Sequence, residues 1–274
     1  MMRILFVSDI VGSPGRDALR LLRRLKEELG YSFCVANGEN AAAGFGLTPR
    51  TAEEIFSAGV DVITSGNHLW DRKEAMELVV HEPRILRPAN YPPPVPGCGQ
   101  GVFLSGDGHA VGVLNLLGRV FIREVDCPFR RADAAVKELS AQTKVILVDM
   151  HAEATSEKVA MGWYLDGRVS AVVGTHTHVQ TADERILPCG TGYITDAGMT
   201  GAFDSVIGIE KQAAIQRFLT QLAVRLTPAR NDVRLNGVLL DVEVGTGVCT
   251  SITRLSVPLD AECGPAADAP GGAS

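Results

Sequence analysis

The stretch Arg3-Ile4-Leu5-Phe6-Val7-Ser8-Asp9 joins an apolar run directly to a carboxylate, and the predicted fold follows from this pattern. A short apolar run bounded by polar residues is typical of a strand buried on both faces. Four more such pairs follow along the chain: 31–36 with Gly38-Glu39-Asn40, 60–64 with Gly66-Asn67-His68, 144–148 with His151, and 169–173 with Gly174-Thr175-His176-Thr177-His178. The repetition predicts strands that carry polar side chains at their carboxyl ends.

Helical segments are predicted between and after the first three of these apolar runs. Ser13-Pro14 is typical of a helix start, and the leucines that follow form an apolar stripe as far as Gly30. Thr48-Pro49 begins a second helix that ends at Gly59, and 71–80 is expected to be a third. Strands that alternate with helices of this length predict an α/β fold with right-handed parallel crossovers.

The rest of the chain is predicted to mix shorter elements. We expect a loop over 88–101, strands at 111–117 and 120–122, and helices at 131–140, 155–164 and 211–226. Short strands are expected at 185–187, 193–195, 233–244 and 250–255. The sequence shows no internal repeat and no clear domain linker, so we expect a single domain over 1–260. The Ala/Gly/Pro-rich end predicts a disordered tail over 261–274.

The composition limits the kinds of partner. A formal net charge of −6, from 26 basic and 32 acidic residues, disfavours binding to duplex DNA but leaves a small phosphorylated substrate open. No apolar run reaches the roughly 20 residues that cross a bilayer, and the start of the chain lacks signal-peptide features. We therefore expect a cytoplasmic protein that does not enter a membrane. Its six scattered cysteines are expected to be reduced thiols, mostly core fillers.

The polar side chains after the strands suit a metal centre. Ligands gather outside the carboxyl ends of the strands in open α/β sheets. One such side chain alone is more often a loop cap or a hydrogen-bonded structural residue. Together, however, carboxylates, a carboxamide and histidines at successive strand ends favour a site for two metal ions. His176 and His178 are two residues apart, so in an extended segment both would face one side, whereas His81 and His109 are expected at the surface.

Four segments form a more specific pattern: Phe6-Val7-Ser8-Asp9-Ile10-Val11-Gly12, Asn37-Gly38-Glu39-Asn40-Ala41-Ala42, Gly66-Asn67-His68-Leu69-Trp70-Asp71, and Tyr193-Ile194-Thr195-Asp196-Ala197-Gly198-Met199-Thr200-Gly201. In these segments the chain resembles calcineurin-like metallophosphoesterases, and within them the bacterial YmdB-like branch. The resemblance runs through most of residues 1–256. It implies a layered sandwich of mixed β-sheets flanked by helices.

The resemblance also implies a ligand set. One ion would take Asp9, Glu39, Asn40 and His178, and the second would take Glu39, Asn67, His151 and His176, with Glu39 as the bridge. The chain departs from the general superfamily pattern, because Val11 and Thr175 stand where ligand histidines are usual. The resemblance to the YmdB-like branch implies that Asn40 takes the place of the histidine missing at Val11. Iron or manganese is favoured, and zinc is also compatible with oxygen and imidazole ligands.

The activity implied is hydrolysis of phosphodiesters, 2′,3′-cyclic nucleotides in particular, by a metal-bridging hydroxide. His68 adjoins a ligand without being needed as one, so we expect it to protonate the leaving oxygen. Its alternative role is a structural hydrogen bond, and Asp71 is a candidate to orient it. Phe203, in the 200–205 loop, is expected either to stack on a base or to pack into the core.

Other functions are compatible with the same residues. A broad phosphomonoesterase or a nuclease on short RNA would use the same metal centre. A regulatory protein would use the centre to sense a nucleotide without hydrolysing it, although such a protein would have no need of His68. A homo-oligomer is also compatible, because short edge strands in the second half could pair subunits.

Overall fold

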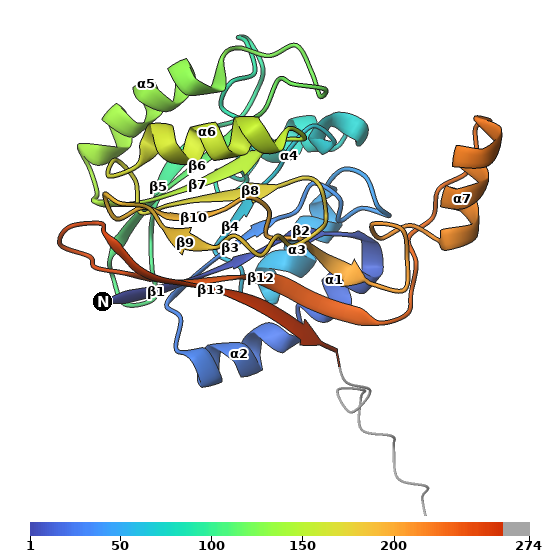
Figure 1. The fold of residues 1–274 in the computed structure, drawn as a ribbon, viewed down its shortest axis with the longest axis horizontal. Coiled ribbons are helices and arrows are strands. Elements are labelled where there is room, and N and C mark those ends of the chain that lie inside the picture. The colour runs from blue at the N-terminus through green and yellow to red at the C-terminus, as the bar shows by residue number, and fades with distance from the viewer. Residues whose placement is uncertain (260–274) are drawn as a thin grey trace, which may run out of the picture.

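Two mixed β-sheets lie face to face in the computed structural model, which describes residues 1–259 (Figure 1). The first sheet has the order β2-β11-β12-β1-β3-β4, with β13 also paired to β12. Its strands are β1 (Met2–Val7), β2 (Asp9–Ile10), β3 (Phe33–Asn37), β4 (Val62–Thr64), β11 (Met199–Ala202), β12 (Val233–Val242) and β13 (Cys249–Pro258). The second sheet has the order β5-β6-β7-β8-β10-β9. Its strands are β5 (Gln100–Leu104), β6 (Ala110–Leu117), β7 (Val145–His151), β8 (Ala171–Thr175), β9 (Arg185–Ile186) and β10 (Gly192–Ile194).

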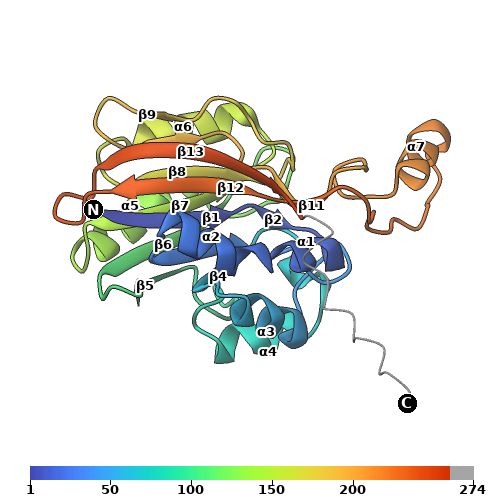
Figure 2. The ribbon, with the colours of Figure 1, turned by 90° about the horizontal axis from the view of Figure 1, so that it is seen from below.

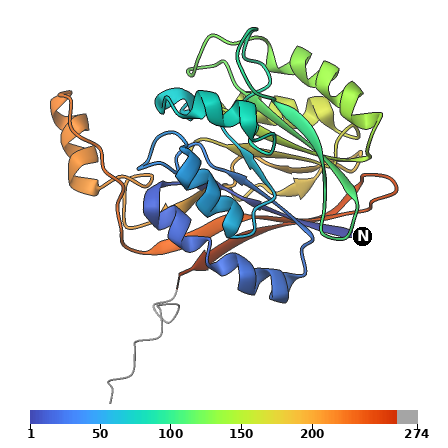
Figure 3. The same cartoon turned by 180° about the vertical axis from the view of Figure 1, so that it is seen from behind.

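Helices cover the outer face of each sheet, as Figures 1 and 3 show. Four helices pack on the first sheet: α1 (Gly12–Ala18), α2 (Leu21–Leu29), α3 (Pro49–Ser57) and α4 (Ala75–His81). Two helices pack on the second: α5 (Pro128–Ser140) and α6 (Thr155–Leu165). The predicted class, a layered sandwich of mixed sheets flanked by helices, is confirmed. No helix within residues 1–259 has the length and apolar character needed to cross a bilayer.

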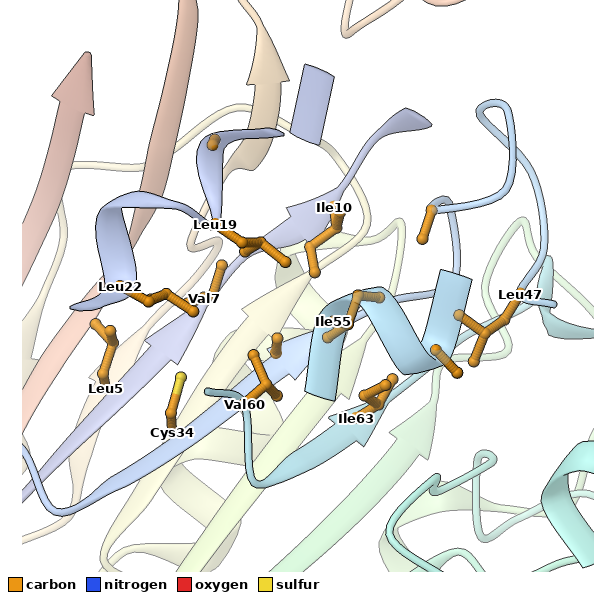
Figure 4. Close-up of a cluster of buried hydrophobic side chains, with 14 of the residues drawn as sticks. Leu5, Val7, Ile10, Leu19, Leu22, Cys34, Leu47, Ile55, Val60 and Ile63 are labelled. Carbon is orange, nitrogen blue, oxygen red and sulfur yellow. The ribbon is translucent and has the colours of Figure 1, made fainter. Parts of the chain in front are cut away.

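Successive side chains of β1 point alternately into two hydrophobic cores, one between the sheets and one beneath the helices. Ile4 and Phe6 pack between the sheets, whereas Leu5 and Val7 pack against the helices (Figure 4). All four are fully buried. Because successive side chains of a strand point to opposite faces, a continuous apolar run is the expected sequence for a strand in the middle layers.

Several predicted elements need correction. The helix expected from Ser13 to Gly30 is two helices, α1 and α2, and the helix expected at 71–80 is a 3₁₀ turn, Leu69–Asp71, followed by α4. The expected strand at 120–122 is a turn in which Phe121 has φ +62°, and β5 occupies part of the expected loop at 88–101. The expected tail at 261–274 lies outside the described residues. Of the five cysteines within them, Cys34 and Cys249 alone are buried, so most of these thiols are not core fillers.

Helix α7 (Lys211–Thr220) stands away from the sandwich (Figures 1 and 2). It is shorter than the expected helix 211–226, because Gln221 takes a left-handed conformation with φ +57°. Phe218 and Leu219 on it are 75% and 80% exposed. At the base of the segment, Ile209 forms a β-bridge with Pro228, and Ala229 N donates to Gly208 O.

Replacing Leu147 with Ala should lower the free energy of unfolding by roughly 2–5 kcal/mol, because Leu147 is 1% exposed between the sheets and its loss leaves a cavity. Urea denaturation followed by circular dichroism measures the change. The matched control is Leu104→Ala, also in the second sheet but 73% exposed, which should change stability by less than about 0.5 kcal/mol. Equal losses in the two variants would contradict a packed layer between the sheets.

Candidate metal centre

The seven residues expected as metal ligands meet at one end of the sandwich, where the carboxyl ends of strands from both sheets converge. The first sheet and its loops supply Asp9, Glu39, Asn40 and Asn67, and the second supplies His151, His176 and His178. Asp9, Glu39 and His151 are 0% exposed. His151 is the last residue of β7, so that strand continues three residues past the expected end.

One group of ligand-type atoms surrounds His151. Its Nε2 lies 3.0 Å from Glu39 Oε1, 3.2 Å from Asn67 Oδ1 and 3.0 Å from His176 Nδ1. One ligand atom from each of Glu39, His151 and His176 can be chosen so that all three lie within 4.8 Å of one another. This separation is compatible with coordination of a single ion.

A second group surrounds His178 and shares Glu39 with the first. His178 Nε2 lies 3.2 Å from Asn40 Nδ2 and 3.8 Å from Asp9 Oδ1, and Asn40 Nδ2 donates to Glu39 Oε1 at 3.2 Å. Two buried oxygens here, Asp9 Oδ1 and Asn40 Oδ1, have no hydrogen-bond partner within residues 1–259. Buried polar atoms are almost always paired, so two unpaired oxygens beside an imidazole fit a cation.

In each of the three histidines, one ring nitrogen faces the ligand-type atoms and the other contacts an acceptor outside these two groups. His151 Nδ1 lies 2.9 Å from Thr175 Oγ1, and His178 Nδ1 lies 2.9 Å from Ile207 O. His176 Nε2 lies 3.1 Å from Glu153 Oε2. Partners of this kind fix the tautomer of a metal-binding histidine, because the nitrogen that donates to them leaves the other with a free lone pair. The geometry therefore aims one unprotonated nitrogen of each ring into the site.

Asp149 extends this arrangement beneath His151. The Thr175 hydroxyl donates to Asp149 Oδ1 at 2.6 Å, which leaves the Thr175 oxygen free to accept from His151 Nδ1. Asp149 Oδ2 accepts from Thr64 Oγ1 and Asn37 Nδ2, and the carboxylate is fully buried. Asp149 was not among the residues predicted from the sequence. The sequence feature that could have indicated it is a single carboxylate within the otherwise mostly apolar run 145–150.

Burial and neighbouring charges shift the acidity of the ligand-type groups. Burial raises the pKa of Asp9 to about 6. Burial opposes ionisation of Glu39 as well and is the largest single effect, but the charges of His151 and His68 and the hydrogen bonds from both residues together outweigh it and lower the pKa of Glu39 to about 2. Burial is also the largest single effect on His151 and opposes its protonation, yet the carboxylates of Glu39, Asp9 and Asp149 together raise its pKa to about 9. The buried carboxylates thus attract positive charge into the site, which a metal ion can supply in place of a proton.

The turn that carries His176 and His178 differs from the expectation. Strand β8 ends at Thr175, and the two histidines have φ +102° and φ +63° rather than an extended conformation. They therefore do not face one side of a strand. Their rings lie instead in different groups, His176 near His151 and His178 near Asn40.

Gly66 lets the backbone pass against the centre of the site. A Cβ at this position would lie 2.3 Å from His151 Nε2 and 2.4 Å from Glu39 Oε2. No side chain larger than hydrogen fits there without displacing one of these groups. Glycine at this position therefore leaves the room that the His151 and Glu39 side chains need.

His68 lies at the mouth of the site, outside both groups. Its Nδ1 is 2.8 Å from Asp71 Oδ2, as the candidate role of Asp71 requires, and its backbone N donates to Glu39 Oε2. The ring makes an edge contact with Phe45 at 5.0 Å and is 31% exposed. The other histidines, His81 and His109, are exposed, as expected.

A cavity of about 460 Å³ opens above the centre. Its apolar wall is formed by Val11, Phe45, Ile207, Ile209 and Leu226. Arg217, from α7, is the one lysine or arginine among the described residues that line it. Phe203 does not line this cavity or belong to a core cluster: it is partly buried beneath the Arg234 guanidinium, 5.3 Å from the ring centre.

Comparison with known proteins shows the family of the chain. The family model described as YmdB-like protein matches residues 5–255. A 2′,3′-cyclic-nucleotide 2′-phosphodiesterase of Bacillus subtilis (strain 168) is 48% identical, over 93% of this chain and 97% of that protein.

Solved structures agree with this result. A hypothetical protein of Thermus thermophilus aligns with a TM-score of 0.88 and 42% identity, covering 94% of this chain and 99% of that one. A novel phosphatase from Mycoplasma pneumoniae aligns with a TM-score of 0.87 and 32% identity, covering 94% and 93%. The chain belongs to the YmdB-like family.

Proposed function

We propose that this protein hydrolyses phosphodiester bonds and that 2′,3′-cyclic nucleotides are its substrates. One observation carries the proposal: two groups of ligand-type atoms share Glu39 beneath a cavity of about 460 Å³. The proposal is supported by the 48% identity to the Bacillus subtilis phosphodiesterase, which extends over 93% of the chain.

The residues fit a pair of divalent cations. Asp9, Asn40 and His178 would hold one ion, Asn67, His151 and His176 would hold the other, and Glu39 would bridge them. When bound, the cations supply water activation near neutral pH and polarisation of a phosphate oxygen. Oxygen and imidazole donors without a thiolate are compatible with manganese, iron or zinc, and the family resemblance favours iron or manganese. Elemental analysis of protein purified without added metal decides among them.

His68 supplies the remaining chemistry in this proposal. With Nδ1 held by Asp71, its Nε2 is the nitrogen left to deliver a proton to the leaving oxygen. The Asp71 carboxylate fixes the orientation of the ring. Contact with Phe45 restricts the imidazole to the mouth of the cavity.

The cavity suits a nucleoside attached to the reacting phosphate. Its volume lies within the roughly 300–1,000 Å³ common for small-molecule sites, and it has a polar floor and an apolar wall. A second candidate activity is phosphomonoester hydrolysis, favoured by the description of a 35% identical Mycoplasma genitalium relative as a putative phosphatase/phosphodiesterase.

A substrate panel tests the proposed activity. Protein loaded with Mn²⁺ or Fe²⁺ should hydrolyse a 2′,3′-cyclic nucleotide with a higher kcat/KM than a nucleoside monophosphate or a short RNA. Chromatographic separation of products gives the three rates. Faster release of phosphate from the monophosphate would favour the phosphatase, faster shortening of RNA would favour the nuclease, and no turnover by the loaded protein would favour a nucleotide sensor.

Glu39→Gln removes the charge shared by the two groups while keeping the side-chain size. We expect metal affinity to fall by more than the roughly 10–100-fold typical for loss of an outer partner of a ligand, with activity lost in parallel. Metal content after gel filtration and kcat are the measurements. Glu53→Gln, an exposed substitution on α3, is the control and should change neither. An E39Q variant as active as the parent would refute the bridging role.

His68→Ala should lower kcat for a 2′,3′-cyclic nucleotide by roughly 10²–10⁴-fold, as expected for loss of a general acid, with metal content unchanged. The loss should be much smaller for bis-p-nitrophenyl phosphate, whose leaving group departs without a proton. His81→Ala, an exposed histidine, serves as control. Equal losses on both substrates, or lost metal, would show that His68 is structural.

A further inference from the structure

A buried ion pair lies beside the turn that carries two of the expected ligands. Lys158 Nζ donates to Asp196 Oδ2 at 2.6 Å, and the two residues are 1% and 0% exposed. Asp196 belongs to the segment Tyr193–Gly201 that the sequence singled out, yet neither residue of the pair is among the seven expected metal ligands or contacts His68. A buried ion pair is weak evidence for stability by itself, since desolvation can cancel the attraction, so its contacts must indicate its role.

Asp196 accepts two hydrogen bonds from Thr177, the residue between the two histidines. Its Oδ2 accepts from Thr177 N at 3.0 Å and from Thr177 Oγ1 at 2.7 Å. Its Oδ1 accepts from Gly198 N at 2.8 Å. With the Lys158 ammonium, four donors converge on one side chain. Only a group that accepts at both ends can satisfy them all, and an ionised carboxylate is such a group.

The turn needs a strong anchor. His176 and His178 both have positive φ, and residues other than glycine keep such conformations only where the surroundings determine them. The strand leading into the turn is also fixed, because a Cβ on Gly174 would lie 1.7 Å from Thr195 O, and Ala197 N donates to Gly174 O at 2.8 Å. The 195–198 segment therefore holds the turn both before and within the pair of histidines.

We propose that Asp196, with its charge balanced by Lys158, is a positioning residue that fixes the 175–178 turn and so sets metal affinity. The inference rests on the metal centre of the proposed function but not on the identity of the substrate. The carboxylate acts through Thr177, and neither Asp196 nor Lys158 touches the ions or the substrate.

Manganese binding to the purified protein, measured by titration calorimetry after removal of bound metal, tests the proposal. Asp196→Asn puts an amide where the four donors meet, and we expect Mn²⁺ affinity to fall by roughly 10–100-fold, as for other partners behind metal ligands. Thr177→Val removes only one donor and keeps the ion pair, so the loss should be smaller. Thr177→Ser keeps both donors and should bind as the parent does.

Asp241→Asn is the matched control. It breaks another ion pair, with Arg3, on strands of the first sheet, and it should leave Mn²⁺ affinity unchanged. Far-ultraviolet circular dichroism identifies any variant that fails to fold. If Asp196→Asn fails to fold, Thr177→Val alone decides the question.

Three results would overturn the inference: parental Mn²⁺ affinity in folded Asp196→Asn, parental affinity in Thr177→Val, or the same loss in Asp241→Asn. A parent protein that takes up no Mn²⁺ would overturn both this inference and the proposed function. A parent that binds Mn²⁺ but hydrolyses no phosphodiester would refute the proposed function alone.

Discussion

A buried negative charge on Glu39 is the constraint around which the rest of the site is organised. An isolated carboxylate away from water is strongly unfavourable, so the fold must bring partners to it. His151 reaches it from the second sheet, while Asn40 and the backbone N of His68 reach it from the first. Gly66 has no side chain because its backbone runs beside that carboxylate. The close approach of the two sheets at this end and the chemistry of the centre are therefore one arrangement.

Much of this arrangement could be predicted because its signals are local. Apolar runs predicted the central strands, since a strand buried on both faces has no polar alternation to obscure it. Polar residues just after those runs predicted which side chains would meet, because parallel strands end at the same edge of a sheet. The pairing of ligands into two groups came from the family resemblance, and spacing along the chain would not have supplied it.

The residues behind the ligands could not be predicted in the same way. Asp149 lies within strand β7 and Lys158 within helix α6. Only folding brings Asp149 to Thr175 and Lys158 to Asp196. Local errors had a similar origin. The apolar residues around Phe121 suggested a strand, but its positive φ makes a turn, and the histidine turn after β8 is set by contacts with a segment about 20 residues further along the chain.

The origin of the ligand-type residues in both sheets has a mechanical consequence. Asp9 and Glu39 follow strands of one layer, and His151 and His176 follow strands of the other. Ions held among them would link the two sheets at this end of the sandwich and oppose sliding of one sheet over the other. Resistance to heat would then depend on free metal concentration, since a ligand that binds only the folded chain shifts the folding equilibrium by mass action.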